Sequence, residues 1–236
     1  MDTLSAMRTA IQSDLNVSSS SSLFPPATID SAINRAYQKA GALFRWPALE
    51  DAKKTSSVAD KEYYDAPSTW RPDSIWRLEV DGDYYGEDPD YSPMVFQDYL
   101  DWKANDINEN STEKKWAVQW LRYFIYPTPS ADGDNNISIW GQMNVEELSV
   151  DGDTTIFSYN SPECNEALVL EAVAILKKKG EAEKSGQMFS EEAKQILAIA
   201  FNKIRQEKAK YEKTQPMFEV DDFFGPGAKK QVTGNF

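Results

Sequence analysis

Acidic side chains are the most abundant groups in this chain that could do chemistry. The 236 residues include 38 Asp and Glu. Neighbouring carboxylates such as Glu146-Glu147, Glu191-Glu192 and Asp221-Asp222 could act as a general acid and base, as in a glycosidase. However, adjacent residues point to opposite faces of a strand and lie about 100° apart on a helix. These pairs are therefore predicted to be solvated surface acids, and no catalytic residue is assigned.

The chain contains no histidine, which removes much of the remaining catalytic chemistry. Ser-His-Asp and Cys-His arrangements, histidine-zinc sites and imidazole proton shuttles all require it. The single cysteine, Cys164, lies between Pro162 and an apolar run, where a small buried thiol is expected. It has no cysteine partner for a disulfide and no histidine to make it a nucleophile. Carboxylate, lysine and Mg²⁺ chemistry stay open, so an enzyme is disfavoured but not excluded.

Three Asp-Gly-Asp sequences, at residues 81–83, 132–134 and 151–153, raise the question of a metal site. Closely spaced carboxylates can bind Ca²⁺, but an EF-hand loop needs ligands at several alternate positions and a closing Glu. Asp-Gly is also the usual composition of a tight hairpin turn, which is the prediction for all three. No glycine-rich phosphate loop is present, so the sequence predicts neither a metal nor a cofactor.

Aromatic residues are concentrated between positions 70 and 140 and allow three interpretations. They can form the core of a small sheet, anchor a subunit contact, or stack on sugars and bases if exposed. Basic residues gather at 177–184 and at Lys229-Lys230, where they could meet a DNA phosphate or an acidic neighbour. The basic residues at 177–184 need no partner, because the helix dipole stabilises cations at a helix C-terminus.

The charge balance limits which partners suit the chain. Its 25 Lys and Arg against 38 acids give a formal net charge of −13. Tight sequence-specific DNA binding is not expected, because the chain repels a phosphate backbone. The excess negative charge can serve solubility alone, or it can form a surface that double-stranded DNA passes without binding. A bilayer-spanning apolar stretch and a secretory signal are not found, which predicts cytoplasmic origin and no membrane partner.

Hydrophobic periodicity predicts helices at both ends of the chain. Amphipathic helices are expected at residues 3–15 and 28–46, the second capped by Thr28 and stopped by Pro47. Further helices are expected at residues 161–179, nearly all apolar, and at 190–213.

Between these ends, short β-type runs alternate with turn residues. Strands are expected at residues 75–80, on both sides of Leu121 within 116–126, and at 137–143. A short helix at residues 95–104 interrupts them. The expected fold is α+β and mainly helical, with an antiparallel bundle from both chain ends, a β-rich excursion and an extended C-terminal arm. The segments are residues 1–47 and 161–213 for the bundle, 48–160 for the β-rich insertion and 214–236 for the arm.

Four short motifs within this order of elements resemble the head-to-tail adaptor, or connector, proteins of tailed bacteriophages. The second helix carries Ile-Asn-Arg-Ala at 33–36 and ends in Phe-Arg-Trp-Pro at 44–47. A Tyr-x-x-Pro step follows at 64–67, and a strand ends in prolines at 123–129. The family closes in the same order, with a buried Ala-rich helix, a longer helix and an extended C-terminus.

The resemblance implies a non-enzymatic virion protein of the neck, made in the host cytoplasm. Such an adaptor forms a ring, here expected to have twelve copies, on the portal protein and leaves a channel for DNA. Its C-terminal arm docks into the portal, and its other face meets the next tail or neck component. The arm residues that carry this docking role are Met217, Phe218, Val220, Phe223, Phe224, Lys229, Lys230, Val232 and Phe236.

Physical reasoning about residues 217–236 agrees with a docking arm. The segment has no periodicity, and alone it buries too little apolar area to offset its ordering entropy. Three other readings stay open: a different neck or tail part (a stopper, tail-completion or baseplate protein), a carbohydrate-binding module resting on the aromatics, and an enzyme resting on the carboxylates.

Overall fold

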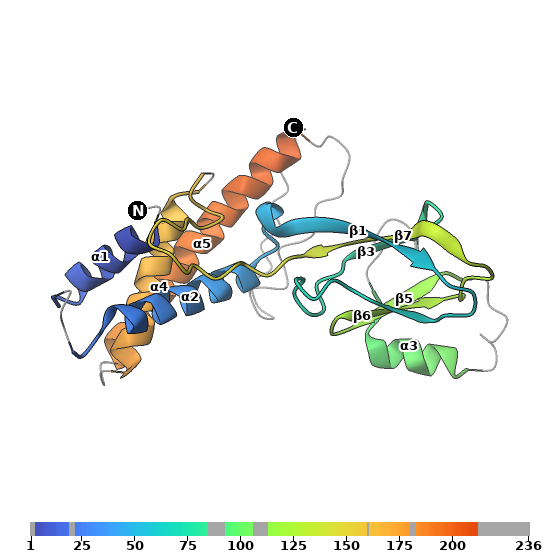
Figure 1. The fold of residues 1–236 in the computed structure, drawn as a ribbon, viewed down its shortest axis with the longest axis horizontal. Coiled ribbons are helices and arrows are strands. Elements are labelled where there is room, and N and C mark those ends of the chain that lie inside the picture. The colour runs from blue at the N-terminus through green and yellow to red at the C-terminus, as the bar shows by residue number, and fades with distance from the viewer. Residues whose placement is uncertain are drawn as a thin grey trace, which may run out of the picture.

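The computed structural model describes residues 3–18, 22–84, 93–105, 113–159, 161–179 and 183–211, with backbone alone at 84, 179, 183–184 and 207–211. Its helices α1, α2, α4 and α5 pack together at one end of an elongated molecule, and two small antiparallel sheets lie at the other (Figure 1). The predicted α+β class is confirmed. The predicted arm at 214–236 lies outside the described residues.

Helices α1 (Leu4–Asp14) and α2 (Pro26–Leu43) form the N-terminal part of the bundle. Thr3 caps α1 by accepting a hydrogen bond from the Ala6 N–H on its side-chain oxygen, 3.3 Å away. The prediction for α2 was wrong at both ends. The helix begins at Pro26 rather than at a Thr28 cap, because proline has the φ that a first helical residue needs. It ends at Leu43, since Phe44 and Trp46 are extended before the 3-10 turn η1 (Pro47–Leu49).

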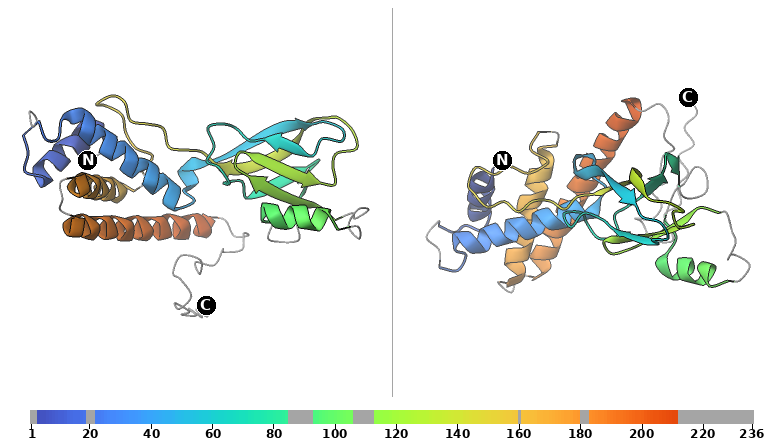
Figure 2. Two further views of the ribbon diagram at one scale, coloured as in Figure 1. Left: turned by 90° about the horizontal axis from the view of Figure 1, so that it is seen from below. Right: turned by 45° about the vertical axis from the view of Figure 1, so that its right-hand side comes forward.

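Helices α4 (Glu163–Lys179) and α5 (Glu183–Tyr211) pack along each other for most of their length (Figure 2). The predicted start of α5 near Ser190 was wrong, because the helix begins at Glu183 and Ser190 is buried within it. Gly186 permits this extension: a Cβ there would lie 3.1 Å from the Ala174 carbonyl oxygen of α4. Gly186 therefore lies at a close contact between α5 and α4.

The β-rich part, which we call the β unit, spans β1 to β7 and includes helix α3 (Phe96–Lys103). One sheet has the order β1-β7-β3-β4 and the other β2-β6-β5, and all pairs are antiparallel. The strands are β1 (Glu50–Ser57), β2 (Tyr63–Asp65), β3 (Arg77–Val80), β4 (Asp83–Tyr84), β5 (Lys115–Gln119), β6 (Arg122–Tyr126) and β7 (Gly133–Gln142).

Most of the predicted elements of the β unit are confirmed. The short helix, the hairpin around Leu121 and the strand before Met143 all form, although β7 begins four residues earlier than expected. Strands β1, β2 and the two-residue β4 were not predicted. The sequence of β1, Glu-Asp-Ala-Lys-Lys-Thr-Ser-Ser, has no apolar alternation, and the strand forms along the edge of β7.

Each part has its own hydrophobic core. The bundle core contains Leu4, Ile29, Trp46 and Leu168, and the core of the β unit contains Trp70, Leu78, Trp116 and Ile139, with no buried residue in common. Residues 143–159, which follow the sheets, return to the bundle and pack Leu148 and Phe157 into its core. A hydrogen bond from the Met143 N–H to the Leu49 carbonyl oxygen, 2.8 Å, closes the base of the β unit.

Within the described residues, no helix combines the length and apolar character that crossing a bilayer requires.

Candidate functional site

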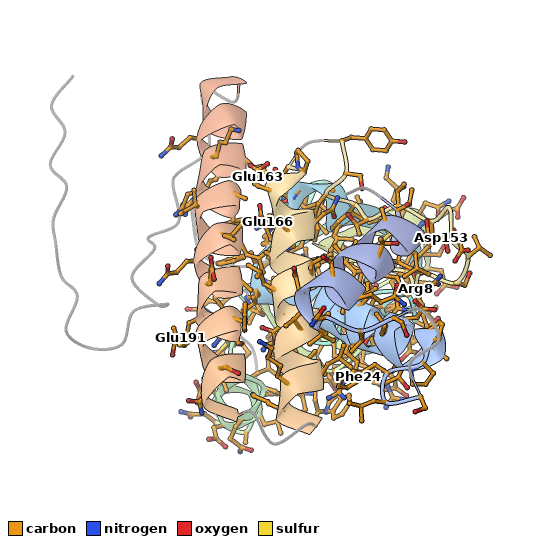
Figure 3. The ribbon with its side chains drawn as sticks, turned by 90° about the vertical axis from the view of Figure 1, so that its left-hand side faces the viewer. Arg8, Phe24, Asp153, Glu163, Glu166 and Glu191 are labelled. Atoms are coloured by element: carbon orange, nitrogen blue, oxygen red, sulfur yellow. The ribbon has the colours of Figure 1, made fainter. Side chains whose placement is uncertain are left out.

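The carboxylate pairs occupy the positions expected of surface acids. Glu146, Glu147, Glu191 and Glu192 are all exposed, and Figure 3 shows Glu191 on the outer side of α5. Asp221-Asp222 lies outside the described residues. Among the residues with a described structure, no group of three or more Cys, Asp or Glu side chains could hold a metal ion.

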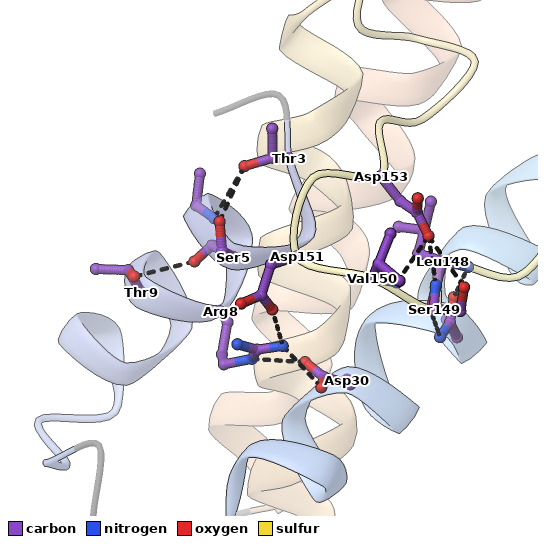
Figure 4. Close-up of polar contacts among 12 residues, drawn as sticks. Thr3, Ser5, Arg8, Thr9, Asp30, Leu148, Ser149, Val150, Asp151 and Asp153 are labelled. Carbon is purple, nitrogen blue, oxygen red and sulfur yellow. Dashed lines mark hydrogen bonds and ion pairs between the residues drawn. The ribbon is translucent and has the colours of Figure 1, made fainter.

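Two of the three Asp-Gly-Asp sequences, at residues 81–83 and 151–153, form turns as predicted, but the prediction for 132–134 was wrong because Gly133 and Asp134 begin strand β7. Asp81 and Gly82 both have positive φ, 55° and 82°, and make the two-residue turn between β3 and β4. Asp132 accepts a hydrogen bond from the Ala59 N–H at 2.8 Å. Asp153 accepts from the Ser149 and Val150 N–H groups at 2.6 and 2.9 Å, which holds the pKa of its carboxyl below the usual range (Figure 4).

Cys164 and Tyr123 are fully buried, and each has a raised pKa. Burial raises the pKa of the thiol from 9.0 to about 12, with a smaller contribution from Glu163. Burial likewise raises the pKa of the Tyr123 phenol from 10.0 to about 12. The thiol is therefore protonated at neutral pH and poorly suited to nucleophilic attack.

These two groups predict a loss of stability in alkali. Both stay protonated in the folded chain, whereas in the unfolded chain they lose their protons near their ordinary pKa values. The free energy of unfolding should be unaffected by them below pH 9 and should fall as the pH rises from 9 to 12. Urea unfolding across this range measures it, and Cys164→Ala should make the fall shallower. A flat profile would contradict the prediction.

The docking residues predicted in the arm cannot be placed, since residues 212–236 lie outside the described residues. The two helix motifs, in contrast, are fully described. The Ile-Asn-Arg-Ala motif lies within α2. The Phe-Arg-Trp-Pro motif lies where the bundle meets the β unit, at a contact that we call the joint, formed by Phe44, Arg45, Trp46, Glu50, Trp76 and Gln142.

Trp46 attaches the joint to the bundle core. It is 1 % exposed and packs edge-on against Phe44, Phe157 and Phe201, with ring centroids 4.8–5.6 Å apart. Its indole N–H donates to the Ala40 carbonyl oxygen of α2 at 2.8 Å. The chain is thus fixed where it leaves the bundle.

Arg45 and Gln142 attach the same point to the β unit. The guanidinium carbon of Arg45 lies 3.3 Å from the centroid of the Trp76 ring, and its Nε lies 3.1 Å from a Glu50 oxygen. Burial lowers the pKa of this guanidinium, and the Glu50 carboxylate partly offsets that effect. Gln142 donates to the Phe44 carbonyl oxygen at 2.9 Å. The chain passes between the bundle and the β unit twice, near Arg45 and near Gln142. Side chains hold both points, which favours a fixed angle between the two parts.

Asn34 holds the returning segment 143–159 against α2. Its side-chain N–H donates to the Leu148 carbonyl oxygen and its side-chain oxygen accepts from the Leu148 N–H, both at 2.9 Å. Asn34 is only 7 % exposed, so these bonds satisfy backbone groups that water does not reach. The asparagine of the Ile-Asn-Arg-Ala motif thus has a structural role.

Asn34→Ala should lower the free energy of unfolding by about 2 kcal/mol, because it leaves the Leu148 N–H and C=O without partners. Gln38→Ala, an exposed amide on the same helix, is the matched control and should stay within about 0.5 kcal/mol of the parent. Urea unfolding measures both. Equal effects would show that the Asn34 hydrogen bonds contribute nothing specific.

An ion-pair network fixes α1 onto the same returning segment (Figure 4). Arg8 donates from Nε and Nη2 to the two carboxylate oxygens of Asp30 at 2.8 and 2.9 Å, and the same Nη2 lies 2.9 Å from an Asp151 oxygen. The Leu4 N–H donates to the Asp153 carbonyl oxygen at 2.9 Å. Hydrogen bonds to Asp30 and Asp151 raise the pKa of the Arg8 guanidinium.

The aromatic residues of the β unit separate into core and surface. Trp70, Tyr99, Trp116 and Tyr123 are fully buried, as the core interpretation predicts. Trp120 is different: it is 73 % exposed at the turn between β5 and β6. It borders an open hollow of about 540 Å³ whose other lining residues are Asp65, Ala66, Ser68, Gln119, Leu121 and Arg122.

Charge is distributed unevenly between the two parts. Residues 50–142 contain 19 acidic and nine basic residues, a net charge of −10. The bundle part, residues 1–49 and 143–211, contains 15 acidic and 13 basic residues, a net charge of only −2. The total charge of −13 conceals this separation, which a count by segment reveals.

Comparison with models of known protein families gives no match for this chain, and comparison with curated proteins gives none either.

Proposed function

We propose that the chain is a structural virion protein, a ring-forming adaptor that binds the portal and links the DNA-filled head to the tail. One observation carries the proposal: both chain ends form a single helical bundle, and the middle leaves it as a separate β unit. This is the arrangement implied by the resemblance to phage head-to-tail adaptors. Two of the motifs behind that resemblance also have structural roles: Asn34 holds the returning segment within the bundle, and Arg45 and Trp46 join the bundle to the β unit.

The proposed partners follow from the same resemblance. The portal binds the C-terminal arm, the next neck or tail component binds the opposite face, and copies of the chain form the ring. The separated phenylalanines of residues 217–236 can each fill a pocket, and Gly225, Pro226 and Gly227 let the arm bend. Ordering the arm costs entropy, so docking should require the assembled portal.

The acidic β unit suits a channel that DNA must pass. A net charge of −10 over residues 50–142 repels a phosphate backbone if this part lines the bore. Mapping the bore of an assembled ring tests this point, and a lysine-lined bore would contradict it.

Electron microscopy of the chain mixed with its candidate portal tests the adaptor proposal directly. The full chain should add a ring of density to one face of the portal, and a chain lacking residues 217–236 should add none. A variant with Phe218, Phe223 and Phe224 changed to Ala keeps the length of the arm and should also fail to bind. Absence of density with the full chain would sink the adaptor proposal in favour of a stopper, tail-completion or baseplate protein.

A carbohydrate-binding module is the second candidate, and Trp120 is the observation that favours it. An exposed indole beside the Arg122 and Asp65 side chains, paired at 3.1 Å, could stack on a sugar ring and bond its hydroxyls. This reading gives no role to the helical bundle. Binding of soluble polysaccharide by the full chain, lost in Trp120→Ala, would favour it over the adaptor.

A further inference from the structure

Strand β1 forms an open edge of its sheet. It is the outermost strand in the order β1-β7-β3-β4, on the side of the β unit opposite α3 (Figure 1). The far end of this edge is closed, because the pairing with β7 shifts register after Thr55. There the Ser56 hydroxyl donates to Asp134 and accepts from the Asn135 N–H, both at 3.1 Å. Residues 50–54 are therefore the open part of the edge.

The backbone groups of β1 point alternately toward β7 and toward the outer edge. The Met143 N–H, which follows β7, donates to the Leu49 carbonyl oxygen at 2.8 Å. The Gln142 carbonyl oxygen points the other way and accepts from the Arg71 N–H at 2.8 Å. Odd-numbered residues of β7 therefore face β1, and the observed register sets them opposite odd-numbered residues of β1. The N–H and C=O groups of the even-numbered residues of β1 consequently point outward.

Ala52 and its neighbours are consistent with an edge that selects its partner. The Ala52 N–H donates to the adjacent Asp51 carboxylate at 2.9 Å rather than to β7. Outward N–H and C=O groups are a template for another strand, and lysines on an edge oppose indiscriminate pairing. Lys53 and Lys54 are both exposed, and among the described residues Lys54 has no acidic partner. A strand that pairs here must therefore bring acids to these two lysines.

The order of charges along the open part matches a second copy of the same strand. Residues 50–54 read Glu-Asp-Ala-Lys-Lys, so the signs reverse about the central alanine. Two such strands can pair antiparallel with Ala52 opposite Ala52. Each Glu50 then faces a Lys54 of the other copy, and each Asp51 faces a Lys53. Opposite charges in directly opposed positions stabilise a pair of strands.

Other registers lack this match. The outward-pointing residues of one copy must face those of the other, so the two-fold axis passes through a residue rather than between two. An axis at any other residue of the open part would set two equal charges directly opposite each other, which destabilises pairing. Within residues 50–54, the axis at Ala52 is the one that opposes no like charges.

The net charge of the β unit does not prevent this contact. Its −10 repels a second β unit at long range, but the open part of β1 holds only two of the 19 acids and is neutral. At about 0.15 M salt, charges separated by more than about 8 Å are largely screened. Directly opposed side chains lie closer than this, so their attraction is reduced less than the repulsion between remote acids.

We propose that two copies of this chain pair through the outer edge of β1, antiparallel and about a two-fold axis at Ala52. The contact uses the same surface on both copies and closes on itself, so it gives a dimer rather than a ring. It therefore goes beyond the adaptor proposal and describes the chain before it docks. Pairing covers the open edge with a partner of matched charge and keeps other strands from adding to it.

Disulfide trapping tests the register. In Ala52→Cys, the two thiols lie on directly opposed residues whose Cα atoms are about 5.5 Å apart, within the range of a disulfide. Ser56→Cys, also exposed on β1, is the control, since the proposed register sets its two thiols far apart. Each full-length variant is oxidised with diamide, which accepts the two electrons and two protons of each disulfide, and the native Cys164 is buried. Ala52→Cys should form covalent dimers and Ser56→Cys should not. Equal yields, or no dimer from Ala52→Cys, would overturn the proposal.

Reversal of the lysine charges gives an independent readout. Lys53→Glu combined with Lys54→Glu makes all four opposed pairs repulsive and should weaken self-association on the order of 10-fold. Lys194→Glu combined with Lys203→Glu makes the same change in total charge at exposed positions of α5 and is the matched control. Sedimentation velocity at about 0.15 M salt measures parent and variants. A monomeric parent, or an equal effect of the two double variants, would refute the contact.

The outcome can be separated from that of the adaptor proposal. Ring density on the portal without the Ala52→Cys disulfide would leave the adaptor intact and exclude the β1 pair. The disulfide without density on the portal would support the pair and remove portal binding.

Discussion

Trp46→Ala should lower the free energy of unfolding by about 3–5 kcal/mol, the usual cost of removing a fully buried tryptophan. The substitution empties the space between Phe44, Phe157 and Phe201 and leaves the Ala40 carbonyl oxygen without its indole donor. Because this site joins the bundle to the β unit, the angle between the two parts should also become less fixed. Urea unfolding measures the first effect and small-angle scattering the second.

Trp120→Ala is the matched control, since it removes the same side chain from an exposed position. It should change stability by less than about 1 kcal/mol. Equal loss of stability in the two variants would mean that Trp46 is not central to the bundle core.

Gly141→Ala should be the most damaging change of a single methyl group in the β unit. A Cβ at this position would lie 2.2 Å from two ring carbons of Trp70, a distance that no real contact allows. Trp70 is fully buried and its indole N–H donates to Asp51 at 3.1 Å, so the ring has little freedom to move. Overpacking of this kind should cost about 3 kcal/mol or more, measured by urea unfolding.

Two variants make this prediction specific. Gly152→Ala adds the same methyl where nothing lies within 4 Å, and it should be nearly neutral. Trp70→Leu is destabilising alone but makes room for the methyl, so Gly141→Ala should cost less in the Trp70→Leu background. Additive effects would show that the clash with the Trp70 ring is not the cause.

Sequence patterns correctly predicted the elements whose own residues show hydrophobic periodicity or the composition of a turn. The Leu4, Met7 and Ile11 stripe gave α1, and Asp81-Gly82 gave a hairpin turn with two positive φ values. Cys164 was placed correctly in a buried position by its apolar neighbours. In each case a local interaction within a few residues determines the outcome.

Elements that depend on a distant partner could not be predicted in this way. Strand β1 is polar and forms because β7, some eighty residues later, offers an edge. Asn34 looks like an ordinary helix residue, and its function depends on Leu148. Trp120 cannot be distinguished by type from the buried tryptophans, since its exposure follows from the turn that Asp73 holds.

The closed base of the β unit has a consequence for how this chain can vary. Because the Met143 N–H bonds to the Leu49 carbonyl oxygen, the two ends of the excursion lie next to each other. A short turn could join them, and the bundle core would lose none of its buried members. The middle of the chain is therefore open to grafting: a longer, shorter or differently folded segment can replace it without repacking the helices. Variation in what the protein contacts can accumulate there while the bundle stays constant.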